Sequence, residues 1–360
     1  MAPNRSVTFV SRKWPPAIGG METYSVKLCQ ALEAHLSVRP LVLPGRADGS
    51  VPRAGALVAW ALRTGLDLLT ARKPTALLHI ADVAIWPLAL LAMIRNRRCQ
   101  VLISAHGTDV AYGLRGGVRG RGYNVYVRIG ARLLRRARLV ANSAATAQHA
   151  ARLGFRDIRV VPLAAEVAAP VSVEPTGRML FSGRLVRRKG LSWFVRTVLP
   201  QLPQEIGLDV AGTIWNEVEE TALKNPRVRF LGQLQHSAMM RAYAGALCVV
   251  VPNLVMPNGE YEGFGLVAVE GAAAGGLVLA AAEGGLTDAV MDGQTGFLLP
   301  PGDATAWAQK IQEILSWSDD TRAAFVAQAR GLARRHYSWD RVARDTAALY
   351  ADLTPVDKVR

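Results

Sequence analysis

Short strand-like runs alternate with helical patterns along nearly the whole chain. The run VTFVS precedes the helical pattern GMETYSVKLCQALEAH, and VRPLVLP precedes an apolar helical pattern over residues 58–69. The alternation starts again with RMLFSGRL and continues through GLDVAGT, VRFLGQL and ALCVVVPN. This period is typical of βαβ units, in which successive strands lie parallel. The chain is therefore expected to form an α/β protein with two parallel sheets.

The length of the chain favours two domains. Its 360 residues exceed the roughly 250 to 300 at which a single hydrophobic core usually stops growing. Between the two series of strands, residues 167–176 contain Pro170 and Pro175 and are expected to be a linker. We therefore expect one domain over residues 1–168, a second over 169–338, and a terminal segment over 339–360.

Two acids flank a glycine-containing loop and an apolar run in NGEYEGFGLVAVEGAAAGG. Glu262 and Glu270 are separated by seven residues. The apolar run between them is expected to begin a buried helix, whose first amides have no partner within the helix. Such a helix start suits a diphosphate, and the glycines let a ligand come close to the backbone. The candidate binding residues there are Phe264, Gly265 and Leu266.

Basic residues follow the strand-like run that opens the second series. FSGRLVRRKG supplies Arg184 and Lys189, which could meet the charge of a leaving phosphate group through charge-assisted hydrogen bonds. Arg187 and Arg188 are interpreted as a solvated basic turn. The chain contains no Asp-x-Asp pair of the kind that holds a catalytic metal ion. No metal site is therefore expected.

Further candidates lie in the first half of the chain. His106 ends an apolar run in SAHGTDV, and α/β sheets place ligands at the carboxyl ends of their strands. Asp109 could orient this loop or a ligand hydroxyl, or it could cap the next turn. Gly19 and Gly20 follow the first strand and would bring backbone N–H groups to a phosphate or an acceptor. The other five histidines are interpreted as core or surface residues.

These segments, in their order, resemble the retaining glycosyltransferases of family 4. The resemblance rests on PAIGGMETYSVKL, SAHGTDV, FSGRLVRRKG, the E-x7-E pattern of the two acids, and HYSWDRVARDTAALY, and it covers nearly the whole chain. It implies the GT-B fold, in which two doubly wound Rossmann-like domains face each other across an interdomain cleft. Residues 1–168 would bind the acceptor, residues 169–338 would bind the nucleotide-sugar, and the terminal segment would be a helix that crosses back to the first domain.

The resemblance also implies roles for the candidate residues. Arg184 and Lys189 would bind the diphosphate of the donor, and Glu270 would reach the ribose hydroxyls. Glu262 would position the sugar hydroxyls and stabilise positive charge at the anomeric carbon during a front-face displacement. His106 would contact the donor sugar near its 6-hydroxyl. All four roles follow from the family resemblance.

The expected function is sugar transfer. We expect a retaining, metal-independent hexosyltransferase without a cofactor, which moves a hexose from a UDP- or GDP-sugar, such as GDP-mannose, to a cell-envelope glycan or lipid-linked oligosaccharide. Two alternatives stay open: a nucleotide-sugar epimerase of the same fold, and a basic peripheral-membrane or nucleic-acid-binding protein of this fold without turnover. The segment AGTIWNEVEE departs from the Gly-x-Gly turn that is usual in the family. The resemblance therefore assigns no contact near Gly212.

The positive charge is confined to the first half. Residues 1–170 hold 24 Lys and Arg against 8 Asp and Glu, whereas residues 171–360 hold 19 against 20. Eleven of these arginines lie between residues 95 and 138, with Asp109 as the one acid among them. Such a charge favours an anionic partner, and the lack of zinc-finger spacing and of an RRM signature argues against nucleic acid. The pattern over 128–138 suits an interfacial helix or a solvated helix face, and we favour an anionic membrane surface.

Other sequence signals concern the compartment. The three cysteines, Cys29, Cys99 and Cys248, are far apart and are expected to be reduced and structural. The start MAPNRSVTFVSRKWPP has no apolar region long enough for a signal peptide. The longest apolar stretch, over 83–94, is shorter than the roughly 20 residues that span a bilayer. We expect a cytoplasmic protein, peripheral on the inner face of the cytoplasmic membrane.

Overall fold

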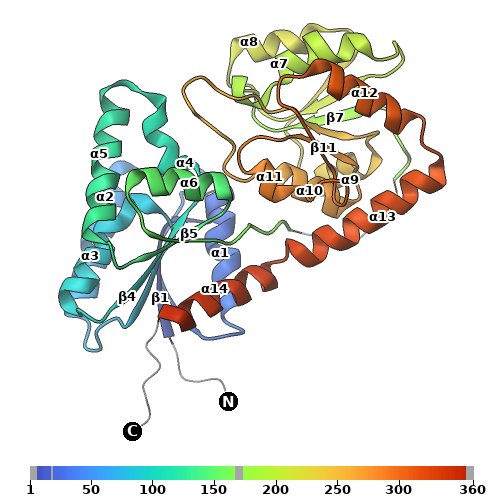
Figure 1. The fold of residues 1–360 in the computed structure, drawn as a ribbon. Helices are drawn as coiled ribbons and strands as arrows, with labels where there is room; N and C mark the ends of the chain where they lie inside the picture. Colours follow the sequence, from blue (N-terminus) through green and yellow to red (C-terminus); the bar gives the residue numbers. More distant parts are fainter. Residues whose placement is uncertain (1–5, 18, 167–172, 354–360) are drawn as a thin grey trace. The chain divides into compact units, whose positions relative to one another are not determined.

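The computed structural model describes residues 6–17, 19–166 and 173–353. By its internal contacts the chain divides into two compact units, one of Met1–Leu163 with Trp339–Arg360 and one of Ala164–Ser338. The expected boundary after residue 168 and most of the expected linker lie outside the described residues. Figure 1 shows the elements of both units, coloured along the sequence.

The first unit contains a six-stranded sheet in the order β2-β1-β3-β4-β5-β6, and all paired strands are parallel. The strands are β1 (Ser6–Trp14), β2 (Ser37–Pro44), β3 (Leu77–Ile80), β4 (Gln100–Ala105), β5 (Arg138–Ala141) and β6 (Asp157–Val160). The helices are α1 (Gly20–Leu32), α2 (Ala54–Thr70), α3 (Trp86–Arg95), α4 (Thr108–Ala111), α5 (Gly117–Leu133), α6 (Ala144–Leu153) and α14 (Trp339–Leu353). The carboxyl ends of all six strands therefore meet at one edge of the sheet.

Helices cover this sheet on both faces (Figure 1). α1 packs against α14, whereas α2, α3, α5 and α6 pack against one another in sequence order. Because parallel crossovers are right-handed, the reversal of strand order beside β1 places these two groups on opposite faces. Burial from both faces explains why every residue of β3 is buried.

A buried hydrogen-bond network joins α14 to the sheet. His79 on β3 is fully buried, with Nδ1 2.5 Å from the Tyr350 hydroxyl of α14 and Nε2 2.7 Å from Ser104 Oγ on β4. Ser104 Oγ also lies 2.7 Å from the Tyr24 hydroxyl on α1. Burial, together with the charge of His106, lowers the pKa of His79 to about 3, so the ring is neutral near pH 7. α14 is therefore part of the core of the first unit.

The second unit contains another six-stranded parallel sheet, in the order β12-β11-β10-β7-β8-β9. Its strands are β7 (Met179–Ser182), β8 (Leu208–Ala211), β9 (Val228–Gly232), β10 (Val249–Val251), β11 (Val278–Ala281) and β12 (Phe297–Leu299). Its helices are α7 (Leu191–Trp193), α8 (Glu217–Glu220), α9 (His236–Gly245), α10 (Leu266–Ala274), α11 (Leu286–Ala289), α12 (Ala304–Leu315) and α13 (Asp319–His336). The expectation of two parallel sheets is confirmed.

Two helical segments differ from the sequence expectation. The helix expected over 191–199 is a short α7 followed by a π-helical turn, Phe194–Val198, and a 3₁₀ turn, Leu199–Gln201. Pro200 lies in the last turn and lacks the N–H that a regular helix would need. α13 was not expected, because its buried positions are only Ala329 and Ala333 and give no apolar period.

The three cysteines are free and buried. Burial raises the pKa of each thiol to about 12, so none is a reactive thiolate at neutral pH. In the part of the chain that the structure describes, no helix combines the length and the apolar character needed to cross a membrane.

Candidate active site

Glu262 lies at the centre of an ion-pair cluster in the second unit. Its Oε2 atom is 2.6 Å from Lys189 Nζ and 2.5 Å from an Nη atom of Arg188. The same oxygen accepts a hydrogen bond of 3.1 Å from Asn253 Nδ2. Lys189 and Arg188 follow β7, whereas Asn253 and Glu262 follow β10, which is paired with β7. The cluster thus lies at the carboxyl ends of two neighbouring strands, where ligands of such sheets bind.

The pKa of the Glu262 carboxyl reflects these cations. Burial by itself would raise the pKa, but the charges and hydrogen bonds of Lys189 and Arg188 outweigh it and hold the pKa well below its usual range. Glu262 is therefore ionised near neutral pH. The expectation of a solvated Arg188 is wrong, because its side chain is only 13% exposed and pairs with Glu262.

A glycine shapes the start of α10. Gly265 has φ of 97°, in the left-handed region, and a Cβ there would run into Leu286. No side chain caps the first turn, which begins at Leu266. The Ala268 amide donates to the Gly265 carbonyl at 2.9 Å, so the amides of Leu266 and Val267 are the ones that can meet an anion. The neighbouring Phe264 is buried, and its ring packs against Tyr337. Phe264 therefore anchors the loop through its side chain and can contact a ligand only through its backbone.

Glu270, on α10, has the opposite pKa shift. Burial raises the pKa of Glu270 to about 7, against a smaller lowering by the Tyr243 hydroxyl, which donates to its Oε2 at 3.4 Å. The nearby Glu166 adds to the rise. Two acids on one loop and helix thus have environments that drive their pKa values apart, an arrangement that is common at functional sites.

A pocket of 240 Å³ opens at the carboxyl ends of β7, β8 and β9. Arg184 and Gly212 are among the residues that line it. The Arg184 guanidinium stands over the ring of Trp215, 5.2 Å from the ring centroid, and Trp215 Nε1 donates to Thr213 Oγ1 at 3.0 Å. Arg184 thus lines this pocket, whereas Lys189 pairs with Glu262 while its side chain lies beside Gly183, another residue of the pocket lining.

Trp215 is a residue that the sequence analysis missed. It is 66% exposed, which is unusual for a tryptophan, and it lies in the segment AGTIWNEVEE that departs from the family pattern. That departure was the available signal. In place of a second glycine turn, this chain has an aromatic ring that holds Arg184.

Replacing Trp215 with alanine is expected to weaken nucleotide binding about two- to fivefold, because Arg184 loses a cation–π partner at an exposed site. Trp215→Phe keeps a ring face and is expected to retain most of the affinity. Isothermal titration calorimetry with the preferred nucleotide measures both. An unchanged dissociation constant in Trp215→Ala would show that the ring does not position Arg184 for the ligand.

Two further residues of the Glu262 cluster have unpaired oxygens. Asn253 is fully buried, and its Oδ1 has no hydrogen-bond partner among the described residues. The same holds for Oε2 of Glu283 within the described ranges. Burial, with the charge of Glu262, raises the pKa of Glu283 to about 7. Unpaired buried oxygens cost free energy, so hydroxyl donors of a ligand would be favourable here.

His106 follows β4 in the first unit. Its Nε2 lies 2.8 Å from the backbone oxygen of Ala81. Because a carbonyl only accepts, Nε2 must carry the hydrogen, which leaves Nδ1 for another partner. The ring packs edge-on against Tyr24, with 4.4 Å between the ring centroids. His106 is thus held in one tautomer at the carboxyl edge of the first sheet.

Asp109 shapes the His106 loop. Its carboxylate accepts hydrogen bonds from the backbone N–H groups of His106 at 2.8 Å, Val110 at 3.0 Å and Val83 at 3.2 Å. Burial raises the pKa of Asp109, partly offset by His106. Of the alternatives for Asp109, the structure supports the orientation of the loop.

Gly19 and Gly20 lie at the start of α1. Gly19 is the residue before the helix, next to the carboxylate of Glu22 in the first turn. Glu22 pairs with Lys13 at 3.1 Å, so a carboxylate already lies at this helix start. The preceding residue, Ile18, lies outside the described residues. Across the described ranges, no group of three or more His, Cys, Asp or Glu side chains is placed to hold a metal ion.

Two family models match the chain. The model for Glycosyltransferase Family 4 matches residues 18–168, and the model for Glycosyl transferases group 1 matches residues 176–316. Among curated relatives, a D-inositol 3-phosphate glycosyltransferase of a Nocardioides species is 37% identical over 152 residues, which cover 42% of this chain and 29% of the relative. The protein of the same description from Corynebacterium diphtheriae is 32% identical over 192 residues, which cover 50% and 43%. The alignments thus span less than half the length of these relatives.

Solved structures match over nearly the full chain. Sucrose-phosphate synthase from Thermosynechococcus elongatus has a TM-score of 0.72 at 23% identity and covers 97% of this chain and 99% of that one. HepE from Anabaena, in complex with UDP and glucose, has a TM-score of 0.69 at 18% identity, with 96% and 99% covered. These likenesses confirm the expected GT-B fold. Since the two glycosyltransferase family models follow one another along the chain in the order of its two sheets, the chain is a glycosyltransferase of the GT-B type, consistent with family 4.

Proposed function

We propose that the protein is a retaining hexosyltransferase that takes its sugar from a UDP- or GDP-sugar without a metal ion. The observation that carries the proposal is the pairing of Glu262 with Lys189 and Arg188 near the uncapped start of α10. The description of HepE in complex with UDP-glucose supports a nucleotide-sugar as the donor class. Cations and amides suited to a diphosphate thus lie next to a carboxylate suited to a developing positive charge.

The proposed reaction breaks the bond between the anomeric carbon and the diphosphate and forms a bond from that carbon to the acceptor oxygen. The acceptor proton passes to the departing diphosphate. Lys189 and Arg184 stabilise the charge of the diphosphate, which takes Lys189 away from Glu262. Glu262 is then an ionised carboxylate beside the anomeric carbon.

The acceptor is proposed to be a cell-envelope glycan or a lipid-linked oligosaccharide. In the first unit a pocket of 440 Å³ is lined by Arg12, Lys13, Tyr112 and Tyr123, among others. Aromatic faces suit sugar rings, whereas Arg12 and Lys13 are already paired with Asp82 at 3.0 Å and Glu22 at 3.1 Å. This chemistry supports a sugar as the acceptor.

An anionic membrane surface is the proposed location of the acceptor, at the inner face of the cytoplasmic membrane. Two helices of one face of the first sheet expose apolar side chains at four-residue spacing, among arginines. They are Val58, Leu62 and Leu66 on α2, and Val125, Ile129 and Leu133 on α5. Exposed apolar stripes bordered by basic residues are typical of helices that lie in a membrane interface.

A thermal-shift screen in EDTA tests the donor proposal. UDP, GDP or ADP that binds only the folded protein raises its stability by about 2.7 kcal/mol at about 100 times Kd. We expect a selective shift with UDP or GDP, and transfer of the sugar from the matching donor when an acceptor fraction is added. Absence of any shift would contradict the proposal and favour a basic protein of this fold without turnover. An epimerised donor without transfer would favour the epimerase.

A further inference from the structure

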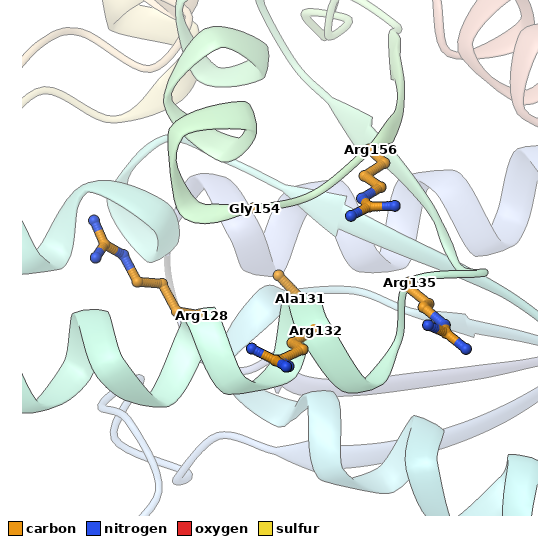
Figure 2. Close-up of a pocket in the computed structure, with 6 residues that line it drawn as sticks. All are labelled: Arg128, Ala131, Arg132, Arg135, Gly154 and Arg156. Carbon is orange, nitrogen blue, oxygen red and sulfur yellow. The ribbon is translucent and has the colours of Figure 1, made fainter.

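Four arginines surround a pocket in the first unit (Figure 2). The pocket has a volume of 350 Å³ and is lined by Arg128, Arg132, Arg135 and Arg156, with Ala131 and Gly154 between them. The first two arginines come from α5, the third from the turn after it, and the fourth from the turn between α6 and β6. We call these four residues the four-arginine pocket.

No acid neutralises the four-arginine pocket. No acidic residue lines it, and within the described parts of the chain none of its four guanidinium groups makes an ion pair or hydrogen bond. Asp157, next to Arg156, pairs instead with Arg138 at 2.9 Å and with Arg159 at 3.7 Å. The four positive charges around this pocket repel one another. An anion bound among them would attract each guanidinium group and offset that repulsion.

The pocket is separate from the candidate active-site residues of the first unit. Arg135 precedes β5, and Arg156 precedes β6. Because the strands are parallel, these starts lie at the edge of the sheet opposite the carboxyl ends, and His106 follows the carboxyl end of β4. A ligand of the four-arginine pocket would therefore not be the sugar donor.

Guanidinium groups bind phosphate oxygens through planar, paired hydrogen bonds, which makes arginine the preferred residue for phosphate recognition. Arg128 and Arg132 are four residues apart, which puts them on one side of α5, and Arg135 follows in the turn after the helix. We propose that the four-arginine pocket is a second anion site of this protein, which binds the phosphate groups of a phosphate ester. The inference goes beyond the proposed sugar transfer and uses none of its residues.

Hydrogen–deuterium exchange on the full chain, with inorganic pyrophosphate as the probe, tests the site and resolves it from the donor site. The pocket variant is Arg132→Gln/Arg135→Gln/Arg156→Gln. The matched control, Arg63→Gln/Arg119→Gln/Arg121→Gln, removes the same charge from exposed arginines of α2 and α5 outside the pocket. Pyrophosphate is expected to slow exchange in peptides over 128–136 and 152–158 in the wild type and the control. In the pocket variant, pyrophosphate is expected to bind to the four-arginine pocket at least about tenfold more weakly, because several charge-assisted contacts are lost.

Equal weakening in both triple variants would overturn the proposal, because it would show diffuse attraction to the basic surface. The proposal would also be overturned if pyrophosphate did not slow exchange in these peptides of the wild type, a result that requires no variant. Nucleotide binding in the thermal-shift screen is expected to be the same in both variants. A failure of the anion-site proposal therefore leaves the donor proposal unaffected, and a failure of the donor proposal leaves the anion-site proposal unaffected.

Sedimentation with vesicles distinguishes the sources of the phosphate ester. Phosphatidylcholine vesicles with and without phosphatidylglycerol are incubated with the same proteins at physiological salt. Loss of binding to the anionic vesicles in the pocket variant alone would identify a lipid headgroup as the ligand. Equal vesicle binding by both variants, with pyrophosphate protection still specific to the pocket, would identify a soluble phosphate ester.

Discussion

Replacing Glu262 with glutamine is expected to lower kcat about 100- to 1,000-fold, which is the usual effect of losing one preorganised electrostatic group. The amide has the same shape and can still accept the hydrogen bond from Asn253. It cannot stabilise positive charge at the anomeric carbon. Initial rates with the donor identified by the thermal-shift screen measure the effect, and full activity in this variant would refute the proposed role.

The same substitution is expected to lower the free energy of unfolding by about 3 kcal/mol, because it leaves two buried cations without their counter-charge. Lys189 and Arg188 have side chains only 10% and 13% exposed. A bound nucleoside diphosphate supplies new negative charge, so it is expected to stabilise the variant more than the wild type. Urea unfolding with and without the nucleotide measures both. Glu205→Gln, which removes the charge of an exposed loop carboxylate in the same unit, is the control and is expected to change neither quantity.

Glu270→Gln is expected to stabilise the protein at pH 8 and to have little effect at pH 4. The pKa of Glu270 is about 7 in the folded chain against a usual value of 4.5. Between these values the folded state binds more protons than the unfolded state, so stability falls as pH rises. At about 1.4 kcal/mol per pKa unit, the glutamine variant should gain about 3 kcal/mol at pH 8.

Urea midpoints from pH 4 to pH 8 check this prediction. Glu205→Gln, which changes an exposed loop carboxylate, is the control and should follow the wild-type curve. A difference between Glu270→Gln and the wild type that stays constant with pH would show that the carboxyl does not titrate as its burial implies.

Glu270 should also make nucleotide binding depend on pH. If the ribose hydroxyls donate to its carboxylate, binding favours the ionised form, and the affinity of the wild type rises as pH increases through 7. The glutamine variant should bind more weakly at pH 8 and show no such rise. Titration calorimetry at pH 6 and pH 8 measures both. A pH-independent wild type would argue against a contact between Glu270 and the ribose.

The fold was predictable because it depends on signals local in sequence. Apolar runs of four to six residues between helical patterns indicate buried parallel strands, and both sheets formed where those runs lie. Local signals also placed Gly265 at the start of α10, since only glycine fits that conformation. The end of α7 at Trp193 could not be predicted, because the apolar pattern of the sequence continues through Phe194–Val198, where the backbone changes from an α-helix to a π-helical turn.

The candidate site was predictable only in part. Glu262 and Lys189 could be named from motifs, but their pairing could not, because the two loops meet only through the pairing of β7 with β10. Arg188 is 74 residues from Glu262 in sequence, and the basic segment around it is typical of a solvated turn. Likewise, the basic pattern of α5 was visible in sequence, whereas Arg156 joins it only through the packing of α6.

The position of α14 has a consequence for synthesis on the ribosome. The second unit is continuous in sequence and is inserted into the first, whose element α14 is made after the whole of the second unit. Until α14 has emerged, α1 lacks the helix that covers it, and His79 lacks the Tyr350 hydroxyl that binds its Nδ1. The unit that starts first along the chain is therefore completed last, after the second unit has had the time to fold by itself.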